Sequence, residues 1–515
     1  MEESGAGHGS CPQPQPATGV VAPADRISSL PDDLLLHVLS HLGNPGAAAR
    51  KTLLSRRWRG LFSQLPSVDV TIRDVLLGSL EDRLRHAARP GVRLLDIAVP
   101  EHDLPTTDSS EQRFTLAQHV HRGPCGTISS VLREAARMSP VQLRFTVPSN
   151  LTMSPGDRYG SVELPRFNRA TSIELRTPPP IPLTHSRAIT GKVHFPLLES
   201  LSLSGCRVDL AALIPRCPRL RELTVVTGTP GDVDFIIQSL LQRLVVDRNS
   251  IPTRRIVVQA PELKQLTMSL NASRDLTVSI VAPIVDKVSW RCSYTSVFHG
   301  LGFWRLLEVS LETAEGHGWW AGWSSNAGTG EEDAGSQLTR VNILSLRLYC
   351  SIGFLGFRDQ EIGFAAEISK HMVTDFSGLE LHLTTRGHAF GSFVWRLLRM
   401  HHISTATRSL RIILQRSEVI VACGPDCPCD GPSDWILQRV SLPKLEKLEI
   451  EGFEGEDQEF DFLRLVFRCA PMLTRVTVRL PDQVTPNDDW CTKLHDIFAE
   501  YPFVEGNIDL IVPGD

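Results

Sequence analysis

Apolar residues recur in one short pattern through the middle of the chain. The spacing is apolar-x-x-apolar-x-apolar, and it is clearest from Leu198 to Leu203. The first positions of six such units are Leu198, Leu220, Leu241, Leu263, Val285 and Leu306. The intervals of 21 or 22 residues lie inside the period of about 20–29 residues that is typical of leucine-rich repeats. The pattern predicts one short strand per unit, stacked in parallel over a shared core.

Less regular units precede and follow these six. Their first positions are Val92, Val141 and Ala170 on one side and Ile343, Phe376 and Thr407 on the other. Segments such as Val75–Ala88 are long enough for helices between strands. We expect Cys206 and Asn271 at places where the chain turns under the coil. The segment from Phe393 to Met400 is predicted to be a helix, and His401-His402 are predicted to lie in the loop that follows it.

A helical pattern of another kind lies near the N-terminus. Pro31 suits the first helical position, and Asp32 and Asp33 favour the positive end of a helix dipole. Apolar residues recur at helical spacing over more than one stripe of residues 34–42. Ser55 is the cap of a further short helix. Such short helices bury little surface alone, so we expect their surplus apolar face to contact a partner.

Two blocks in this region carry a family resemblance. They are Ile27-Ser-Ser-Leu30-Pro31-Asp-Asp-Leu34-Leu35 and Leu54-Ser55-Arg56-Arg57-Trp58. Residues 25–66 resemble the F-box of plant F-box/leucine-rich-repeat proteins, with Phe62 where many members carry Trp and a turn-like link at 43–46. The resemblance implies docking on a Skp-type adaptor and, through it, a cullin. The implied adaptor-facing residues are Ile27, Leu30, Pro31, Leu35, Val38, Leu39, Leu54, Trp58, Leu61 and Phe62. The alternative is an ordinary helical cap on the following domain.

The C-terminal part contains a strand–helix–strand block. A strand pattern from Leu442 to Ile450 is followed by an acidic turn, a helical segment at Phe462–Phe467 and a second strand pattern ending at Val478. Residues 441–480 resemble the FBD region that closes many plant F-box/leucine-rich-repeat proteins. We expect this block to cover the last apolar face of the stack.

Together these patterns predict an α/β chain, in which a short all-α F-box is followed by a leucine-rich-repeat solenoid with parallel strands on the concave face. Residues 1–24, rich in Gly, Pro, Ser and Gln, are expected to be a disordered leader. The F-box spans 25–66, and the solenoid spans 67–440 with insertions near 312–337 and 415–435. Residues 441–515 form the last repeats and the FBD-like cap.

Two of the expected loops contain residues with possible binding chemistry. Trp319, Trp320 and Trp323 lie in a Gly-rich insertion, and aromatic side chains are frequent at binding hot spots. They are candidates for target binding, although the same loop could fold back on the solenoid flank. Another loop carries three close cysteines, Cys423, Cys427 and Cys429. Zinc commonly takes four ligands, so this half-site favours a surface loop, and no metal is expected.

Composition excludes several function classes. The net charge of −5 gives no basic surface for nucleic acid, and no apolar run is long enough to span a membrane. No secretory signal is visible, and eleven scattered cysteines indicate reduced thiols in the cytoplasm or nucleus. Phosphate-binding loops, nucleophile elbows and His-Glu zinc motifs are absent. We therefore expect neither a catalytic site nor a cofactor.

The function predicted from these features is non-catalytic. The chain is expected to be the substrate-recognition subunit of an SCF-type cullin–RING E3 ubiquitin ligase, with its F-box on the adaptor and its solenoid on a target protein. The alternative is an interaction scaffold, or a receptor for a small hormone-like molecule, without a ligase role. A receptor would gather cations on the strands, and Arg207, Arg221, Arg243 and Lys264 are the candidates. The target itself cannot be read from the sequence.

Overall fold

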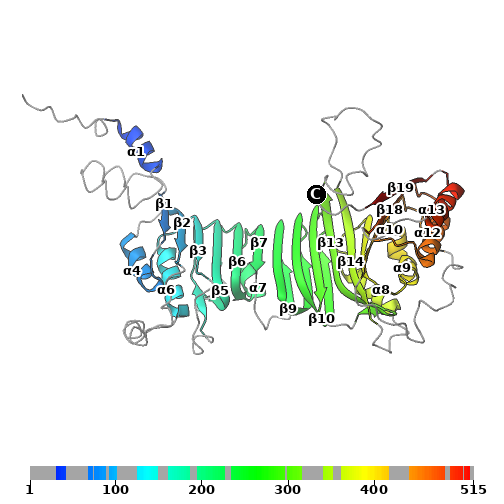
Figure 1. Ribbon diagram of the computed structural model, residues 1–515. Helices are drawn as coiled ribbons and strands as arrows, with labels where there is room; N and C mark the ends of the chain where they lie inside the picture. Colours follow the sequence, from blue (N-terminus) through cyan, green and yellow to red (C-terminus); the bar gives the residue numbers. More distant parts are fainter. Residues whose placement is uncertain are drawn as a thin grey trace, which may run out of the picture. The chain divides into compact units, whose positions relative to one another are not determined.

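The structure is a computed structural model of the chain (Figure 1). It describes residues 30–41, 68–73, 75–87, 92–100, 124–148, 160–185, 194–226, 234–295, 299–315, 340–351, 361–416, 440–481, 488–502 and 504–510. The chain divides into two compact units, residues 1–71 and 72–515. Each unit is described separately below.

In the first unit, the described residues form helix α1 (Asp32–His41) and begin strand β1 (Val68–Ile72). The Leu35 N–H donates to the Pro31 carbonyl at 3.1 Å. Pro31 therefore directly precedes the helix, one position earlier than the sequence predicts. Asp32 and Asp33 occupy the first turn, where their charges favour the helix dipole.

The second unit begins with a parallel strand ladder, which we call the main ladder. Its order is β2, β3, β5, β6, β7, β9, β10 and β11, and every neighbouring pair is parallel. The bounds are β2 (Val92–Ala98), β3 (Gln142–Thr146), β5 (Ser172–His185), β6 (Ser200–Val208), β7 (Glu222–Val226), β9 (Arg243–Gln259), β10 (Gln265–Val281) and β11 (Lys287–Tyr294). This confirms the parallel strands that the first five regular units predict.

Register explains how the repeated apolar residues build one core. Leu201 lies opposite Leu223, which lies opposite Leu244, and Leu244 lies opposite Leu266. All four side chains are at most 2% exposed. The apolar positions of successive units therefore stack strand by strand, which gives each unit a core that it cannot form alone.

Proline-containing turns precede many of the strands. Five turns share a hydrogen bond of 3.1 to 3.4 Å from the fourth residue's N–H to the first residue's carbonyl, with Pro in the second position. They span 195–198, 217–220, 260–263, 442–445 and 470–473. Proline fixes φ near the value that this turn position requires. The buried fourth residue, always Leu, then starts the strand pattern in the same register each time.

A second set of strands, which we call the second ladder, was not predicted. Strands β5, β6, β9 and β10 are longer than one repeat strand requires, and their C-terminal parts pair again after register shifts. Two short strands join these parts: β4 (Val162–Leu164) pairs with β5, and β8 (Asp234–Gln238) pairs with β9. The shifts fall beside Cys206 and Asn271, as expected for residues at turns of the coil.

Helices take the connecting positions elsewhere. Helices α4 (Leu77–Ala87) and α6 (Pro124–Arg137) accompany β2 and β3, and α7 (Leu210–Leu213) continues into the 3-10 helix η2 (Ile214–Arg216) after β6. Helix α4 confirms the expected helix at Val75–Ala88.

The sixth regular unit does not continue the parallel ladder. Strand β13 (Trp304–Glu315) is antiparallel both to β11 and to β14 (Arg340–Cys350). A short strand, β12 (Gly300–Leu301), pairs with the start of β13 across a tight turn at Gly302, whose φ is +61°. The prediction of a sixth parallel repeat at Leu306 is therefore wrong. Alternating apolar residues read the same in both directions, so the pattern does not report strand polarity.

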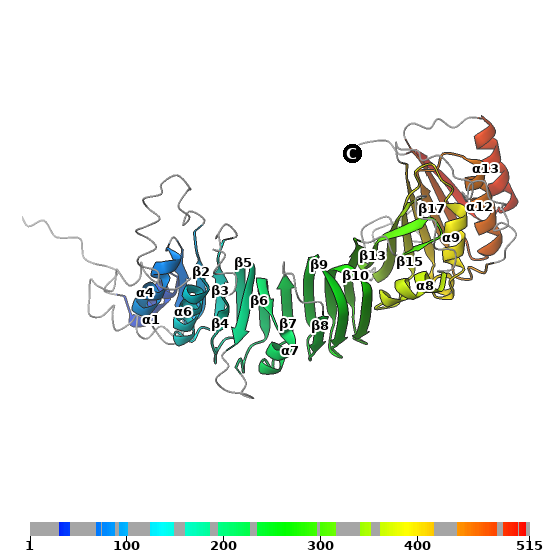
Figure 2. The ribbon, with the colours of Figure 1, turned by 90° about the horizontal axis from the view of Figure 1, so that it is seen from below.

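Beyond β14 the strands are parallel again and alternate with helices. The strands are β15 (Gly378–Thr384), β16 (Ser409–Gln415), β17 (Lys447–Glu451), β18 (Arg475–Leu480) and β19 (Glu505–Leu510). The helices are α8 (Glu361–Lys370), α9 (Gly391–Leu398), α10 (His401–Ala406), α12 (Asp457–Cys469) and α13 (Asp488–Glu500). Figure 2 shows α8, α9, α12 and α13 on one side of these strands.

Two expectations for this part can be compared with the structure. Strands β17 and β18 flank α12, which contains Phe462–Phe467, so the strand–helix–strand block is confirmed as structure. His401 and His402 begin helix α10 and do not form a loop, which corrects the sequence interpretation. The extended Met400 at the helix N-cap separates α9 from α10, so a second helix follows the predicted one where a loop was expected.

Candidate protein-interaction surfaces

The residues predicted to face an adaptor lie partly in the described structure. Leu35, Val38 and Leu39 are in helix α1, and Leu30 and Pro31 directly precede it. The other five lie outside the described residues, namely Ile27, Leu54, Trp58, Leu61 and Phe62. The structure therefore gathers half of the predicted set on one short segment.

Helix α1 also exposes a residue that the predicted set leaves out. Leu34 is 47% exposed, whereas the neighbouring Leu35 is fully buried. Leu34 belongs to the apolar stripe that continues to Val38, so the helical spacing carried the signal. A large apolar side chain at the surface of so short a helix is suited to burial by a partner.

The two loop candidates lie outside the described residues. Trp319, Trp320 and Trp323 lie outside the described residues, between β13 and β14. The structure does describe the base of that loop, where Glu315 is opposite Arg340 and their side chains form an ion pair at 3.6 Å. Cys423, Cys427 and Cys429 also lie outside the described residues, between β16 and β17.

The strand side chains that point away from the core form a surface that we call the open face. In the middle repeats, which we define as β6, β7, β9 and β10, one row of this face is uncharged. Ser202 lies opposite Thr224, Thr224 opposite Val245, and Val245 opposite Thr267. All four side chains are partly or fully exposed.

In the C-terminal repeats, which we define as β14 to β18, a different row of this face carries charge, because the register connects Glu380 through Ser345 to Arg291 and not to Thr267. Glu380, Arg411 and Glu449 are neighbours in register. Arg411 contacts three carboxylates, at 3.8 Å to Glu380, 3.4 Å to Glu449 and 2.8 Å to Glu451. Arg479 also contacts Glu449 at 3.2 Å. We call these residues the ionic ladder.

Partial burial distinguishes the ionic ladder from ordinary surface ion pairs. The side chains of Arg411, Glu380 and Glu449 are 13 to 15% exposed. Burial raises the pKa of the Glu449 carboxyl, and the charges of Arg411 and Arg479 oppose that rise. Because these charges lie largely out of water, removing one partner leaves the others uncompensated.

A smaller charged group lies on the open face near the start of the main ladder. Glu174 of β5 contacts Arg144 at 2.8 Å and Arg176 at 2.6 Å. Burial alone would raise the pKa of Glu174, but the hydrogen bonds and charges of the two arginines outweigh it and lower that pKa. Glu174 lies opposite Ser202, so this charged group directly precedes the uncharged row of the middle repeats.

Three of the four cations considered for a small-molecule receptor are neighbours on the main ladder. Arg243 lies opposite Glu222 at the start of β9, and Arg221 and Lys264 directly precede β7 and β10. Arg207 lies in the C-terminal part of β6, opposite Pro182. All four are exposed. Arg221 and Lys264 lie on either side of Gln242, to which each is joined by a backbone hydrogen bond, and Arg243 follows Gln242 in the chain. Arg207 lies apart from these three.

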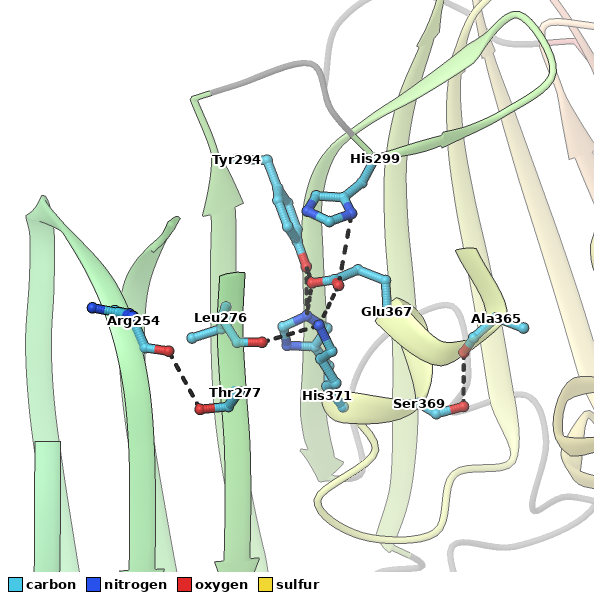
Figure 3. Close-up of polar contacts among 10 residues, drawn as sticks. Arg254, Leu276, Thr277, Tyr294, His299, Ala365, Glu367, Ser369 and His371 are labelled. Carbon is cyan, nitrogen blue, oxygen red and sulfur yellow. Dashed lines mark hydrogen bonds and ion pairs between the residues drawn. The ribbon is translucent and has the colours of Figure 1, made fainter. Parts of the chain in front are cut away.

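A buried polar group of residues lies where β13 reverses the ladder (Figure 3). The Tyr294 hydroxyl is 2.8 Å from Glu367 Oε1 and 2.5 Å from His371 Nε2. The Trp290 indole N–H donates to His371 Nδ1 at 3.1 Å. Lys370 donates to Glu367 Oε2 at 2.6 Å and to the Leu276 carbonyl at 3.0 Å. We call these side chains the α8 cluster.

The environment of the α8 cluster favours a structural role over catalysis. Burial by itself would raise the pKa of Glu367, but hydrogen bonds from His371, Lys370 and Tyr294 lower it to about 2. Burial lowers the pKa of His371 and raises that of Tyr294. His371 is fully buried and Glu367 is 2% exposed, so neither can meet a substrate in this state. No sequence pattern predicted this group, because its members are up to 81 residues apart.

Metal-binding and thiol chemistry has little support in the described residues. No group of three or more His, Cys, Asp or Glu there could hold a metal ion. Burial raises the pKa of Cys206 to about 11 and those of Cys217 and Cys292 to about 12. These three thiols therefore remain protonated near neutral pH. Within the described residues, no helix is long and apolar enough to cross a membrane.

Comparison with known proteins places the chain among plant proteins. Residues 163–283 match a family model described as FBD-associated F-box protein At5g56370, LRR repeats. The rice MEIOTIC F-BOX protein MOF (Oryza sativa subsp. japonica) is 26% identical over 276 residues, which are 51% of this chain and 50% of that protein. The putative F-box/FBD/LRR-repeat protein At5g44950 of Arabidopsis thaliana is 25% identical over 297 residues, 56% of this chain and 58% of that protein. The chain thus spans about half the length of these two relatives.

A third relative decides the family. F-box protein At5g03100 of Arabidopsis thaliana is 32% identical over 266 residues, which are 51% of this chain and 75% of that protein. The chain belongs to the plant F-box/leucine-rich-repeat family. The match at residues 163–283 covers β4 to β10 and includes the middle repeats and the second ladder. Membership of this F-box/leucine-rich-repeat family indicates a role in protein interaction.

Proposed function

We propose that the chain is the substrate-recognition subunit of an SCF-type cullin–RING E3 ubiquitin ligase. In this proposal residues 25–66 are the F-box, which binds a Skp-type adaptor and, through it, a cullin. Residues 67–440 are the solenoid that binds the target protein, and 441–515 are the last repeats with the FBD-like cap. The protein would act in the cytoplasm or nucleus, without a catalytic site or cofactor of its own.

Family membership is the observation that carries this proposal, and helix α1 supports it. The exposed Leu34 beside the buried Leu35 gives the N-terminal unit an apolar residue for a partner. The acidic first turn and the Pro31 start match the F-box resemblance of the sequence.

The mechanism is one of positioning. The F-box would hold the ligase core while the solenoid holds the target in the same complex. Linking the two binding events raises the effective concentration of a target lysine near the charged ubiquitin-conjugating enzyme. Correct placement of two reactants can account for a large part of a rate enhancement without any catalytic residue on the subunit.

The direct test is co-purification with a Skp-type adaptor. The full chain is compared with the double variant Leu30→Ala/Pro31→Ala and with Leu240→Ala, a control at a 57% exposed leucine of the solenoid. We expect the wild type and the control to retain the adaptor and the double variant to lose it. Circular dichroism of all three chains checks that the solenoid remains folded. Equal adaptor binding by the double variant would refute the assignment of the F-box.

A further inference from the structure

The C-terminal end of helix α8 is attached to the preceding strands by polar contacts. Glu367, Lys370 and His371 are three and four residues apart, so their side chains share one face of the helix. Lys370 donates to the Leu276 carbonyl of β10, and His371 accepts a hydrogen bond from Trp290 of β11. His371 also contacts Tyr294 of β11 (Figure 3). The same helix buries Phe364 and Ile368, which are 2% and 1% exposed. Release of these polar contacts would expose apolar surface.

Hydrogen-bond chemistry fixes the protonation state of His371. An indole N–H can only donate, so Nδ1 of His371 must be the acceptor facing Trp290 and carries no hydrogen. In the neutral ring the hydrogen is then on Nε2, from which it is donated to the Tyr294 hydroxyl oxygen. The Tyr294 hydroxyl in turn donates to Glu367. This arrangement satisfies every polar atom of the imidazole without a charge.

A second proton on His371 is incompatible with this arrangement. The second proton would have to be on Nδ1, which lies 3.1 Å from the Trp290 indole nitrogen. Two N–H donors would then face each other, and no hydrogen bond could form between them. The charges around the imidazole ring only partly compensate for the loss of the hydrogen bond with Trp290. On α8, Glu367 favours the imidazolium at 3.8 Å from Nε2, whereas Lys370 disfavours it. His299, before β12, also disfavours it, while Cys292 and Tyr294 on β11 are neutral groups.

We propose that the α8 cluster is an acid-sensitive latch, in which protonation of His371 breaks its hydrogen bond with Trp290 and releases the C-terminal end of α8 from β10 and β11. The latch is a conformational device of the solenoid. It is independent of adaptor binding, because all of its members lie in residues 276–371.

The pH window of the latch follows from the sign of the pKa shift. Burial lowers the pKa of His371 below 6.5 in the closed state. The latch therefore contributes its full stability above pH 6.5 and loses it as the pH falls toward the lowered value. Glu367 titrates in a separate window, because its pKa is lowered from 4.5 to about 2. Loss that begins just below pH 6.5 thus reports His371, not Glu367.

Hydrogen exchange of the full chain tests the latch without any mutation. Exchange is measured at pH 7.5, 6.5 and 5.5 and corrected for the intrinsic rate, with α6 as the internal control helix. We expect the opening equilibrium of α8 to rise by up to about tenfold per pH unit below pH 6.5, the slope for uptake of one proton, while α6 does not change. Equal responses of the two helices would overturn the proposal.

Two variants assign the effect to His371. In His371→Gln the amide can still accept from Trp290 and donate to Tyr294 but cannot titrate, so the pH dependence of α8 exchange should vanish. Trp290→Phe removes the donor that opposes the second proton, so the ratio of opening at pH 5.5 to that at pH 7.5 should shrink. If both variants retain the wild-type pH dependence, the latch does not depend on His371 and the proposal is wrong.

Discussion

The middle repeats and the C-terminal repeats share one inward pattern but present different chemistry outward. Leu223 and Leu448 are both buried strand residues of stacked units. On the open face, however, the uncharged Thr224 row of the middle repeats contrasts with the ionic ladder around Arg411. The regions also differ behind the strands, where the middle repeats have the second ladder and the C-terminal repeats have helices. The inward pattern therefore sets the stacking, while outward residues and connections differentiate each region.

The largest expected effect is on the helical layer of the C-terminal repeats. Phe462 of α12 is fully buried and meets Phe390 with ring centroids 5.4 Å apart. Phe462→Ala should reduce the local free energy of unfolding by about 3–5 kcal/mol, because it removes a large side chain and leaves a cavity. Hydrogen exchange should show the loss in α12 and spare the middle repeats. A loss spread equally over both regions would contradict the distinction between them.

The next effect concerns acid stability at the α8 cluster. Glu367 has a pKa lowered from 4.5 to about 2, so its stabilising contribution is present above pH 4.5 and is lost as the pH falls toward 2. The shift corresponds to at most about 3 kcal/mol. Urea unfolding, monitored by hydrogen exchange of α8, should show this loss of stability in the wild type. Glu367→Gln should be less stable at pH 7 and should lack the loss between pH 4.5 and 2.

The ionic ladder should respond more weakly. Arg411→Ala leaves three carboxylates without their shared cation, and we expect a loss of about 1–3 kcal/mol in the C-terminal repeats. The matched control is Arg243→Ala in the middle repeats, where the side chain is exposed and the expected change is within about 0.5 kcal/mol. Thermal unfolding, combined with hydrogen exchange of the strands around each site, measures the change in stability for both variants. Equal effects would show that the ladder does not contribute to stability.

The smallest effect is expected on the uncharged row. Thr224 is partly exposed, and its neighbours Ser202 and Val245 are uncharged. Thr224→Glu should change the free energy of unfolding by no more than about 0.5 kcal/mol, because the carboxylate stays in water. A loss above 1 kcal/mol in chemical denaturation would mean that this row is less accessible than the structure indicates.

The sequence predicted the buried strand residues of the repeats better than it predicted strand direction. The period of 21 or 22 residues identified the strands of the main ladder, because core packing requires apolar residues at fixed intervals. The polarity of β13 was not predictable from that pattern, since alternation is symmetric. The turn at Gly302, where the chain reverses between β12 and β13, is a local signal of that polarity within the described residues.

The second ladder and the α8 cluster show two further limits. Phe235-x-Ile237 and Ile256-x-Val258 alternate like strands, so β8 and the end of β9 had a readable signal outside the repeat template. Trp290 and His371 have no such signal, because their contact depends on how distant segments pack. The F-box assignment, in contrast, depends on a family resemblance, and five of its ten predicted adaptor-facing residues lie outside the described structure.

The most direct measurement of the account is the stoichiometry of the purified full chain with a purified Skp-type adaptor, by light scattering after size-exclusion chromatography. We predict a one-to-one complex that the Leu30→Ala/Pro31→Ala variant does not form. Separate elution of the two wild-type proteins at micromolar concentration would contradict the proposed ligase role and leave the chain as a leucine-rich-repeat interaction protein.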